Sequence, residues 1–379
     1  MSNARKLMMA AAGNGGGAYS MFTWGTSSEG ILGDSVGSRN SPVLVGASND
    51  FYWLADNDGN KLIMNRQGGT NVKSDGTLWV WGQGASGGLG DGTTVNKSSP
   101  VQIGALTDWY GVGYGCYDQN RRFFLKTNGT LWATGDNGSS GCLGNNSLAD
   151  VSSPIQIGAL TNWTVNIASG QSHTNAIKTD GTLWGWGSGD GGRRGATGAV
   201  SSPVQIGALT NWSTVACGSD HTISVKTDGT LWGWGYNYFG ALGDGTTTTR
   251  NSPVQIGALT NWGQIDAGRR LSASVKTDGT LWMWGYNNAG QLGQGNTTAQ
   301  SSPVQVGAGT DWLRISLGNR FALATKTNGT LWAWGDGGST GFLGLGNNTD
   351  YSSPVQVGSE ADWKFVSAGG INSLGLREI

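Results

Sequence analysis

The sequence is short of charged residues, glutamate, proline, cysteine and histidine. Only 12% of its 379 residues are charged, and glutamate occurs just three times. A mostly helical protein is rich in glutamate and poor in glycine, because glycine costs about 1 kcal/mol at an interior helix position. This composition therefore excludes a mainly helical fold. The formal net charge is −1, so the charge balance does not favour a nucleic-acid or anionic-lipid partner.

The scarcity of metal-binding side chains excludes several kinds of site. Residues 56–60 resemble the start of a calcium loop, but the twelfth position holds Gln67 where a bidentate glutamate is needed. No run of 18 apolar residues occurs, so we expect no membrane span. We also expect no metal and no cofactor. The scattered cysteines are too few for a disulfide framework or a zinc site: Cys116, Cys142 and Cys217.

Glycine and tryptophan, in contrast, are abundant. The chain has 68 glycines and 19 tryptophans, and glycine exceeds its usual share of about 7% more than twofold. A collagen-like chain would need glycine at every third position and much more proline. A disordered chain would not carry so many aromatic side chains. The remaining class is a β protein with glycine-rich turns and aromatic packing.

Prolines and tryptophans reveal an internal repeat. Tryptophan falls into three repeat positions: seven follow an A-L-T-[ND]-W or similar phrase, six lie in G-T-L-W, and six lie two residues further on. The chain is therefore one unit repeated seven times. Every proline belongs to an S-P-[VI] tripeptide, and successive prolines are 49 to 58 residues apart: Pro42, Pro100, Pro154, Pro203, Pro253, Pro303 and Pro354.

One unit, residues 253–302, predicts four short strands and no helix. The strands are expected at residues 254–256, 262–267, 272–277 and 280–284. Asp278 and Gly279 predict a type I′ hairpin turn between the last two. Four short strands in each unit of about 50 residues are typical of a β-propeller blade, which buries its faces against neighbouring blades.

The two ends of the chain predict how the ring closes. The last unit stops before the D-G-T-L-W-x-W-G segment, and a matching strand occurs at the N-terminus, at residues 19–25. We predict an all-β fold: a seven-bladed β-propeller closed by the N-terminal strand pairing with the C-terminal blade. Closure removes exposed sheet edges. Residues 19–379 form this domain, and residues 1–18 form an N-terminal extension.

The repeat resembles that of regulator-of-chromosome-condensation-type propellers. Residues 224–245 read S-V-K-T-D-G-T-L-W-G-W-G-Y-N-Y-F-G-A-L-G-D-G, and two units keep a G-x-x-H-T phrase at residues 170–174 and 218–222. The resemblance covers almost the whole chain and implies the propeller fold. Some members of that family exchange nucleotides on small GTPases and bind chromatin through individual loops. This sequence shows no counterpart of those loops, and fold alone does not transfer function.

The N-terminal extension suggests a particular setting. Its R-K-L-M-M-A-A-A-G segment resembles the opening of virion proteins from tailed phages of marine bacteria. This resemblance implies an anchor that joins the propeller to other virion proteins. Two alternatives remain open: a signal peptide, although the apolar core is short for one, and a disordered tail.

The sequence offers little for catalysis. His173 and His221 hold equivalent places in adjacent repeats, so we expect them to hydrogen-bond within their own blades instead of forming a catalytic pair. Glycine abundance produces accidental matches to G-x-S-x-G at residues 84–88 and to G-x-G-x-x-G at 82–87, but neither leads into a helix. The repeated lysines before the hairpin turns are expected to be solvated: Lys73, Lys126, Lys178, Lys226, Lys276 and Lys326.

The first two units depart most from the repeat and provide a candidate contact surface. The stretch from the strand tryptophan to the lysine takes 14 residues in units four to six, 17 in unit two and 20 in unit one. Unit three instead carries Arg193 and Arg194 in its glycine-rich loop. Drift in a terminal repeat is the alternative explanation. The aromatic and arginine residues of unit two are typical of contact surfaces: Tyr110, Tyr114, Tyr117, Arg121, Arg122 and Phe123.

Together these features favour a protein that is not an enzyme. We predict a structural or host-contact component of a tailed phage virion, such as an adhesin, tail fibre or decoration protein. It would bind a host surface receptor or glycan through propeller loops. The alternative is a secreted or cytoplasmic protein-binding propeller such as a GTPase regulator.

Overall fold

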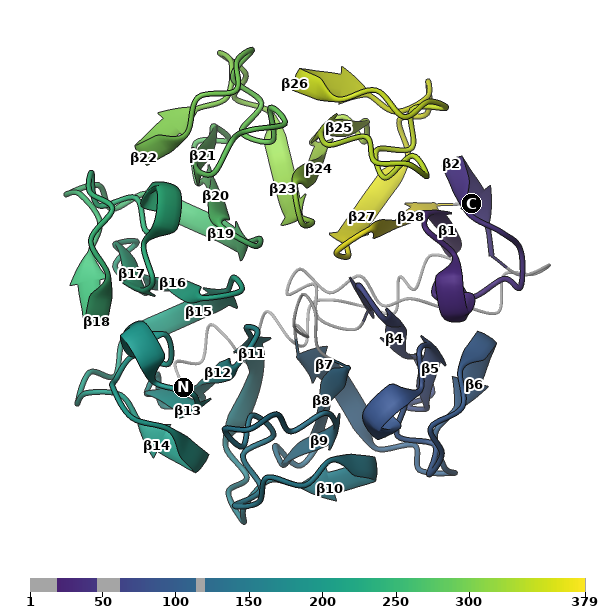
Figure 1. Cartoon of the computed structure of the whole chain (residues 1–379), viewed down its shortest axis with the longest axis vertical. Coiled ribbons are helices and arrows are strands. Elements are labelled where there is room, and N and C mark those ends of the chain that lie inside the picture. The colour runs from purple at the N-terminus through teal and green to yellow at the C-terminus, as the bar shows by residue number, and fades with distance from the viewer. Residues whose placement is uncertain (1–18, 46–61, 114–119, 379) are drawn as a thin grey trace, which may run out of the picture.

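Seven four-stranded antiparallel sheets are arranged in a closed ring around a common axis (Figure 1). The structure is a computed structural model and describes residues 19–45, 62–113 and 120–378. The predicted all-β, seven-bladed propeller is confirmed. We number the blades along the chain, so that blade 7 joins its two ends.

In each blade, successive strands pair from the axis outwards. Blades 1 to 3 consist of β3 (Leu62–Asn65), β4 (Gly68–Val72), β5 (Leu78–Gly82) and β6 (Lys97–Gln102); β7 (Trp109–Gly113), β8 (Arg121–Lys126), β9 (Leu131–Gly135) and β10 (Val151–Gln156); and β11 (Trp163–Ser169), β12 (His173–Lys178), β13 (Leu183–Gly187) and β14 (Val200–Gln205). Blades 4 to 6 consist of β15 (Trp212–Cys217), β16 (His221–Lys226), β17 (Leu231–Gly235) and β18 (Arg250–Gln255); β19 (Trp262–Ala267), β20 (Leu271–Lys276), β21 (Leu281–Gly285) and β22 (Gln300–Gln305); and β23 (Trp312–Leu317), β24 (Phe321–Lys326), β25 (Leu331–Gly335) and β26 (Tyr351–Gln356).

Blade 7 closes the ring as predicted, with two strands from each end of the chain. Its order is β27 (Trp363–Ala368), β28 (Asn372–Glu378), β1 (Tyr19–Gly25) and β2 (Arg39–Leu44). Strand β1 pairs with β28 along its whole length, from Tyr19 opposite Glu378 to Gly25 opposite Asn372. The N-terminal part therefore supplies β2 in addition to the single closing strand that the sequence predicted.

The loops of the ring lie on two faces. Because neighbouring strands are antiparallel, turns after the first and third strands of a blade lie on one face, which we call the upper face. Turns after the second and fourth strands lie on the opposite, lower face. Four short 3-10 helices lie in upper-face loops: η1 (Ser28–Gly30), η2 (Ala85–Gly87), η3 (Asp190–Gly192) and η4 (Tyr238–Gly240).

The prolines lie in the outermost strand of each blade. Pro253, for example, belongs to β18, which pairs with β17 and completes blade 4. The sequence grouping had placed this segment at the start of the following unit, so the predicted repeat was shifted by one strand. An outermost strand tolerates proline because its missing N–H can face outwards instead of toward a partner strand.

The hairpin between the second and third strands is not the predicted type I′ turn. Gly279 has a φ of +78°, but Asp278 does not share a positive φ. The amide of Lys276 donates to Thr280, and the amide of Gly279 donates back to Lys276, both at 2.9 Å. This pattern is a type I turn followed by a glycine in the left-handed region. Asp278 stabilises the turn by accepting hydrogen bonds from the amide and hydroxyl of Thr280.

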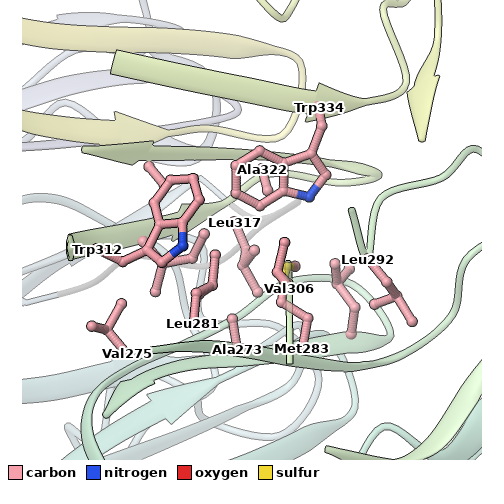
Figure 2. Close-up of a cluster of buried hydrophobic side chains, with 13 residues drawn as sticks. Ala273, Val275, Leu281, Met283, Leu292, Val306, Trp312, Leu317, Ala322 and Trp334 are labelled. Carbon is pink, nitrogen blue, oxygen red and sulfur yellow. The ribbon is translucent and has the colours of Figure 1, made fainter. Parts of the chain in front are cut away.

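The hydrophobic core lies between blades. Figure 2 shows one such cluster, in which Leu281 and Met283 of blade 5 face Trp312 and Trp334 of blade 6. All four side chains are at most 6% exposed. A single sheet could not bury these side chains, so each blade depends on its neighbours.

A recurring contact joins four of the blades to the loop of the preceding blade. The indole of Trp284 is fully buried, and its Nε1 donates a hydrogen bond to the carbonyl of Ala241 at 2.9 Å. The hydroxyl of Ser272 donates to the same carbonyl at 2.8 Å. Gly243 lies against the indole so closely that a Cβ would be 2.8 Å from its nitrogen. The same indole–carbonyl bond recurs in three other interfaces: Trp24 to Phe342, Trp186 to Cys142 and Trp334 to Gln291.

The repeated lysines are not solvated strand ends, so that prediction is wrong. Lys178 is 4% exposed, and its Nζ lies 3.5 Å from the ring centre of Trp184 and 4.8 Å from that of Trp163. Burial lowers the pKa of Lys178, and attraction between the cation and the two ring faces offsets that cost. Each lysine therefore stabilises the edge of a blade. The arrangement recurs around Lys126, Lys226, Lys276 and Lys326.

Each histidine side chain bonds to the following blade. The prediction that the histidines bond within their own blades is therefore wrong. Nε2 of His173 lies 2.9 Å from the hydroxyl of Thr222, and Nε2 of His221 lies 2.8 Å from that of Ser272. Burial lowers the pKa of His221 to about 4 and that of His173 well below its usual value. Both imidazoles are therefore neutral parts of the blade interfaces. Leu271 takes the equivalent place in blade 5, because it too begins the second strand.

Removing β1 should prevent ring closure. A chain that starts at Tyr19 keeps β1, and we expect its thermal melting to match that of the full chain. A chain that starts at Thr26 lacks β1, which separates β2 from β28, and we expect it to lose cooperative melting and to aggregate. Near-ultraviolet circular dichroism of the tryptophans during heating measures both. A cooperative melt of the shorter chain at the full-chain temperature would contradict this mode of closure.

Replacing His221 should make stability less sensitive to acid. The unfolded imidazole takes up a proton below about pH 6.5, whereas the folded one resists protonation until about pH 4. The free energy of unfolding therefore falls as pH drops through this window. In His221→Leu, which copies Leu271, we expect the slope to decrease by up to about 1.4 kcal/mol per pH unit. Urea unfolding from pH 4.5 to 7 measures the slopes, and equal slopes would refute the assignment.

Candidate functional site

The structure corrects the contact surface predicted from unit two. Arg121, Arg122 and Phe123 begin β8, and their exposed fractions are 0%, 3% and 1%. Arg121 donates to the carbonyl of Gly170 in blade 3 at 3.3 Å, and Arg122 donates to the hydroxyl of Thr70 in blade 1 at 2.8 Å. These side chains link blade 2 to both neighbours. They are not available as the exposed contacts that the sequence predicted.

The other residues predicted to form contacts differ in burial, and two of them lie outside the described part of the chain. Tyr110 is half-buried and packs against the core between blades 2 and 3. Tyr114 and Tyr117 lie outside the described residues, so their role stays a prediction. In blade 3, Arg194 is 5% exposed and donates to carbonyls of its own loop. Arg193 is partly buried, and its guanidinium lies beside the ring of Tyr236.

Four aromatic side chains gather on the upper face of blades 4 and 5. We call Tyr236, Tyr238, Phe239 and Tyr286 the aromatic patch. The rings of Tyr236 and Tyr238 stack with centroids 5.2 Å apart, and those of Phe239 and Tyr286 are 4.5 Å apart. Tyr238 is 47% exposed and Phe239 is 42% exposed. The patch therefore exposes two of its rings to solvent, while Tyr236 and Tyr286 are partly buried.

Phe239 takes an unusual backbone conformation. Its φ is +59°, which is uncommon for a bulky side chain. The corresponding position holds Glu29 in blade 7, Ser86 in blade 1 and Gly191 in blade 3. These residues share the conformation, with φ between +54° and +62°, so it belongs to the repeated loop, and Phe239 is the bulkiest side chain among them. Here Asn237 fixes the loop by accepting from the amide of Leu242 at 2.9 Å.

Arginine side chains border the aromatic patch. The guanidinium of Arg193 lies 5.0 Å from the ring centre of Tyr236, and it pairs with Asp220 at 2.9 Å. The guanidinium of Arg270 lies 5.3 Å from the ring centre of Tyr238 and 5.8 Å from that of Phe239. Aromatic and arginine side chains together are the composition enriched at the centres of protein interfaces.

A small cavity opens beside the patch, between blades 5 and 6. Its volume is about 150 Å³. We call it the arginine pocket, because arginines supply half of its lining: Arg269, Arg270, Arg320, Tyr286, Asn288 and Asn319. Tyr286 belongs to both features, so the pocket and the aromatic patch form one continuous upper-face site.

The first strands of the blades enclose a second cavity around the ring axis. Its volume is about 70 Å³, and Asp266 is the single carboxylate among the described residues of its lining. The amides of Leu317 and Ala267 donate to Asp266, each at 2.8 Å. Burial nevertheless raises the pKa of Asp266 to about 6. The carboxylate is thus a bridge between β19 and β23.

The described residues contain no group of three histidine, cysteine, aspartate or glutamate side chains placed to hold a metal. In the same part of the chain, no helix has the length and apolar character to cross a membrane. The G-x-S-x-G match leads into the three-residue η2 instead of a helix that could support a nucleophile.

Sequence reasoning missed the upper-face site. Its residues lie in loops of three different blades, which only the ring brings together. A signal existed, however: Tyr238 and Phe239 stand where other units carry small or polar residues. Arg269 and Arg270 similarly replace Ser219 and Asp220 of the preceding unit.

Curated proteins with matching sequence include the E3 ubiquitin-protein ligase HERC2 of Homo sapiens and of Mus musculus. Each is 29% identical over 126 residues, which is 33% of this chain. The match covers only 3% of the length of HERC2.

Solved structures and a family comparison match nearly the whole chain. Yeast RCC1 (Prp20) bound to Kap60 has a TM-score of 0.80 at 20% identity, covering 96% of this chain and 89% of that one. Human WBSCR16 has a TM-score of 0.80 at 21% identity, covering 95% and 99%. At these identities the structures establish the fold. The family described as the RCC1-like domain matches residues 20–374, and the chain therefore belongs to the RCC1-like domain family.

Proposed function

We propose that this chain is a non-enzymatic binding propeller that recognises a protein partner through the aromatic patch. The observation that carries the proposal is the outward placement of Tyr238 and Phe239 on a fixed loop. Large aromatic side chains contribute much of the binding energy in protein interfaces when a partner covers them. Their exposure in the free chain is therefore better explained by a partner than by folding.

The rigidity of the patch supports this role. Tyr236 and Tyr238 stack, Phe239 packs against Tyr286, and Arg270 lies over two of the rings. These contacts fix the rings before a partner arrives, so binding would cost little side-chain entropy. The arrangement also keeps arginine donors beside an apolar surface, which suits a partner with both apolar and acidic groups.

Relatives of this chain offer a precedent for protein binding by the fold. Yeast Prp20 has been solved with Kap60, and its structure has been described together with its binding to Gsp1p and histones. We propose protein binding for this chain on its own surface, and we do not assign it those partners.

Two finer versions of the function remain predictions. The virion version, with residues 1–18 as an anchor to other virion proteins and a host receptor or glycan as ligand, depends on a segment outside the described residues. The GTPase-regulator version, in a cellular or secreted setting, draws on the family. Mass spectrometry of purified virions should detect the chain if the first version holds. Stimulated nucleotide release from a small GTPase should occur if the second version holds. If neither result is obtained, both versions are wrong.

Replacing the two most exposed rings should weaken partner binding. We expect the Tyr238→Ser, Phe239→Ser variant to raise the Kd for the partner by at least about 30-fold, because a single central interface aromatic contributes about 2 kcal/mol. The partner is isolated by affinity purification with the wild-type chain, then purified and titrated by calorimetry. The variant should melt like the wild type, since both side chains lie outside the core.

The matched control is Leu259→Ser. Leu259 is 50% exposed in a lower-face loop, so this variant also removes an exposed apolar side chain but should leave the Kd unchanged. If the control and the aromatic variant weakened binding equally, or if neither did, the aromatic patch would not be the binding surface.

A further inference from the structure

The arginine pocket is built from three loops of two adjacent blades. Arg269 and Arg270 lie in the turn between β19 and β20, and Arg320 lies in the corresponding turn between β23 and β24. Asn288, from the loop after β21, completes the wall between them. All of these turns are on the upper face, so the pocket opens on the same side as the aromatic patch.

The positive charge of the pocket is only partly neutralised. Arg320 pairs with Asp336 at 3.3 Å and donates to Asn288 at 3.1 Å, which fixes its guanidinium. Arg270 lies over aromatic rings, and neither Arg269 nor Arg270 has an ion pair among the described residues. The Nε atoms of Arg270 and Arg320 also lack a hydrogen-bond acceptor within the described part of the chain. The pocket therefore concentrates positive charge locally, although the net charge of the whole chain is −1.

We propose that the arginine pocket binds the carboxylate of an acidic side chain on the partner protein, while neighbouring apolar residues of that partner cover the aromatic patch. This proposal rests on the proposed function and names the chemistry of the partner. Planar guanidinium groups bind a carboxylate through paired N–H donors, and these charge-assisted bonds are among the strongest that side chains form. A cavity of about 150 Å³ holds the end of one side chain.

The aromatic patch beside the pocket favours a carboxylate over a phosphate group. Asp336 neutralises Arg320, so Arg269 and Arg270 leave the pocket with a net charge of +2, which is enough for either anion. The proposed partner is a protein that covers Tyr238 and Phe239, and the anionic groups of unmodified protein side chains are carboxylates. The phosphoserine peptide tests the alternative, because its phosphate carries close to two charges near neutral pH.

Short fluorescent peptides test the proposal directly. Three peptides share flanking leucine and phenylalanine residues and differ only in a central glutamate, glutamine or phosphoserine. We expect the glutamate peptide to bind the wild-type chain at least tenfold more tightly than the glutamine peptide, because a hydrogen bond to a charged group is worth that factor or more. Fluorescence anisotropy measures each Kd, and added sodium chloride should weaken only the anionic peptides.

Pocket variants assign the effect to the arginines. Arg269→Gln should remove most of the preference for glutamate while leaving the Kd of the glutamine peptide unchanged. Arg270→Gln should also remove the preference, and it should weaken the glutamine peptide as well, because Arg270 lies over the rings of Tyr238 and Phe239. Lys364→Gln is the matched control, because it removes one positive charge from an exposed position in blade 7 and should leave the preference intact. Binding of the glutamine peptide that requires Phe239 reports on the aromatic patch alone, so failure of the pocket and failure of the proposed function are distinguishable.

Several outcomes would overturn the proposal. Equal affinity for glutamate and glutamine peptides, including no binding of either, would show that the pocket does not select a carboxylate. A preference for phosphoserine over glutamate would assign it to a phosphate group. Binding of a sialylated trisaccharide that is lost in Arg270→Gln, without binding of the glutamate peptide, would assign it to an acidic glycan.

Discussion

The packing of one indole against the loop of the preceding blade is the contact on which the ring depends. Trp284 shows the elements of this contact: full burial, a hydrogen bond to the carbonyl of Ala241, and a glycine, Gly243, that leaves room for the ring. Since the contact always joins one blade to another, no blade completes its own core. This explains why β1, which carries Trp24, is needed to complete the interface between blades 6 and 7. It also explains why the glycines that contact the indoles cannot be replaced without displacing a ring.

Much of this architecture can be read from the sequence because its causes are local and periodic. The proline and tryptophan positions give the number of blades, and the missing last strand gives the closure. Side-chain contacts between strands are harder to predict from the sequence. Lys178 looked solvated because its ring partners, Trp163 and Trp184, are separated from it in the chain and are brought together only by strand pairing. The type I turn is the mirror image of type I′, and a D-G pair fits either the two central residues of type I′ or a type I turn that ends in a left-handed glycine.

The error at Arg121 and Arg122 has a similar origin. An arginine beside aromatic residues in an irregular unit resembles a contact surface. The strand register, however, places these arginines in the interfaces between blades. Arg121 pairs with Gly135 as His173 pairs with Gly187 and Leu271 with Gly285. This strand position faces the blade interface whatever residue fills it. Alignment by strand register, instead of by distance from the tryptophan, would have placed these arginines inside.

The upper-face site could not be assembled from the sequence, because the ring itself creates it. The same inter-blade contacts that fix the core leave the loop tips free to vary, since Asn237 and its hydrogen bonds hold the base of the loop while the side chains of Tyr238 and Phe239 extend beyond it. The left-handed backbone at Phe239 recurs at Glu29 and Ser86, so the loop keeps one conformation while the side chain at its tip varies. Substitutions that depart from the repeat at a loop tip can therefore serve binding without weakening the fold, whereas departures inside a strand, as at Arg121, must serve the fold first.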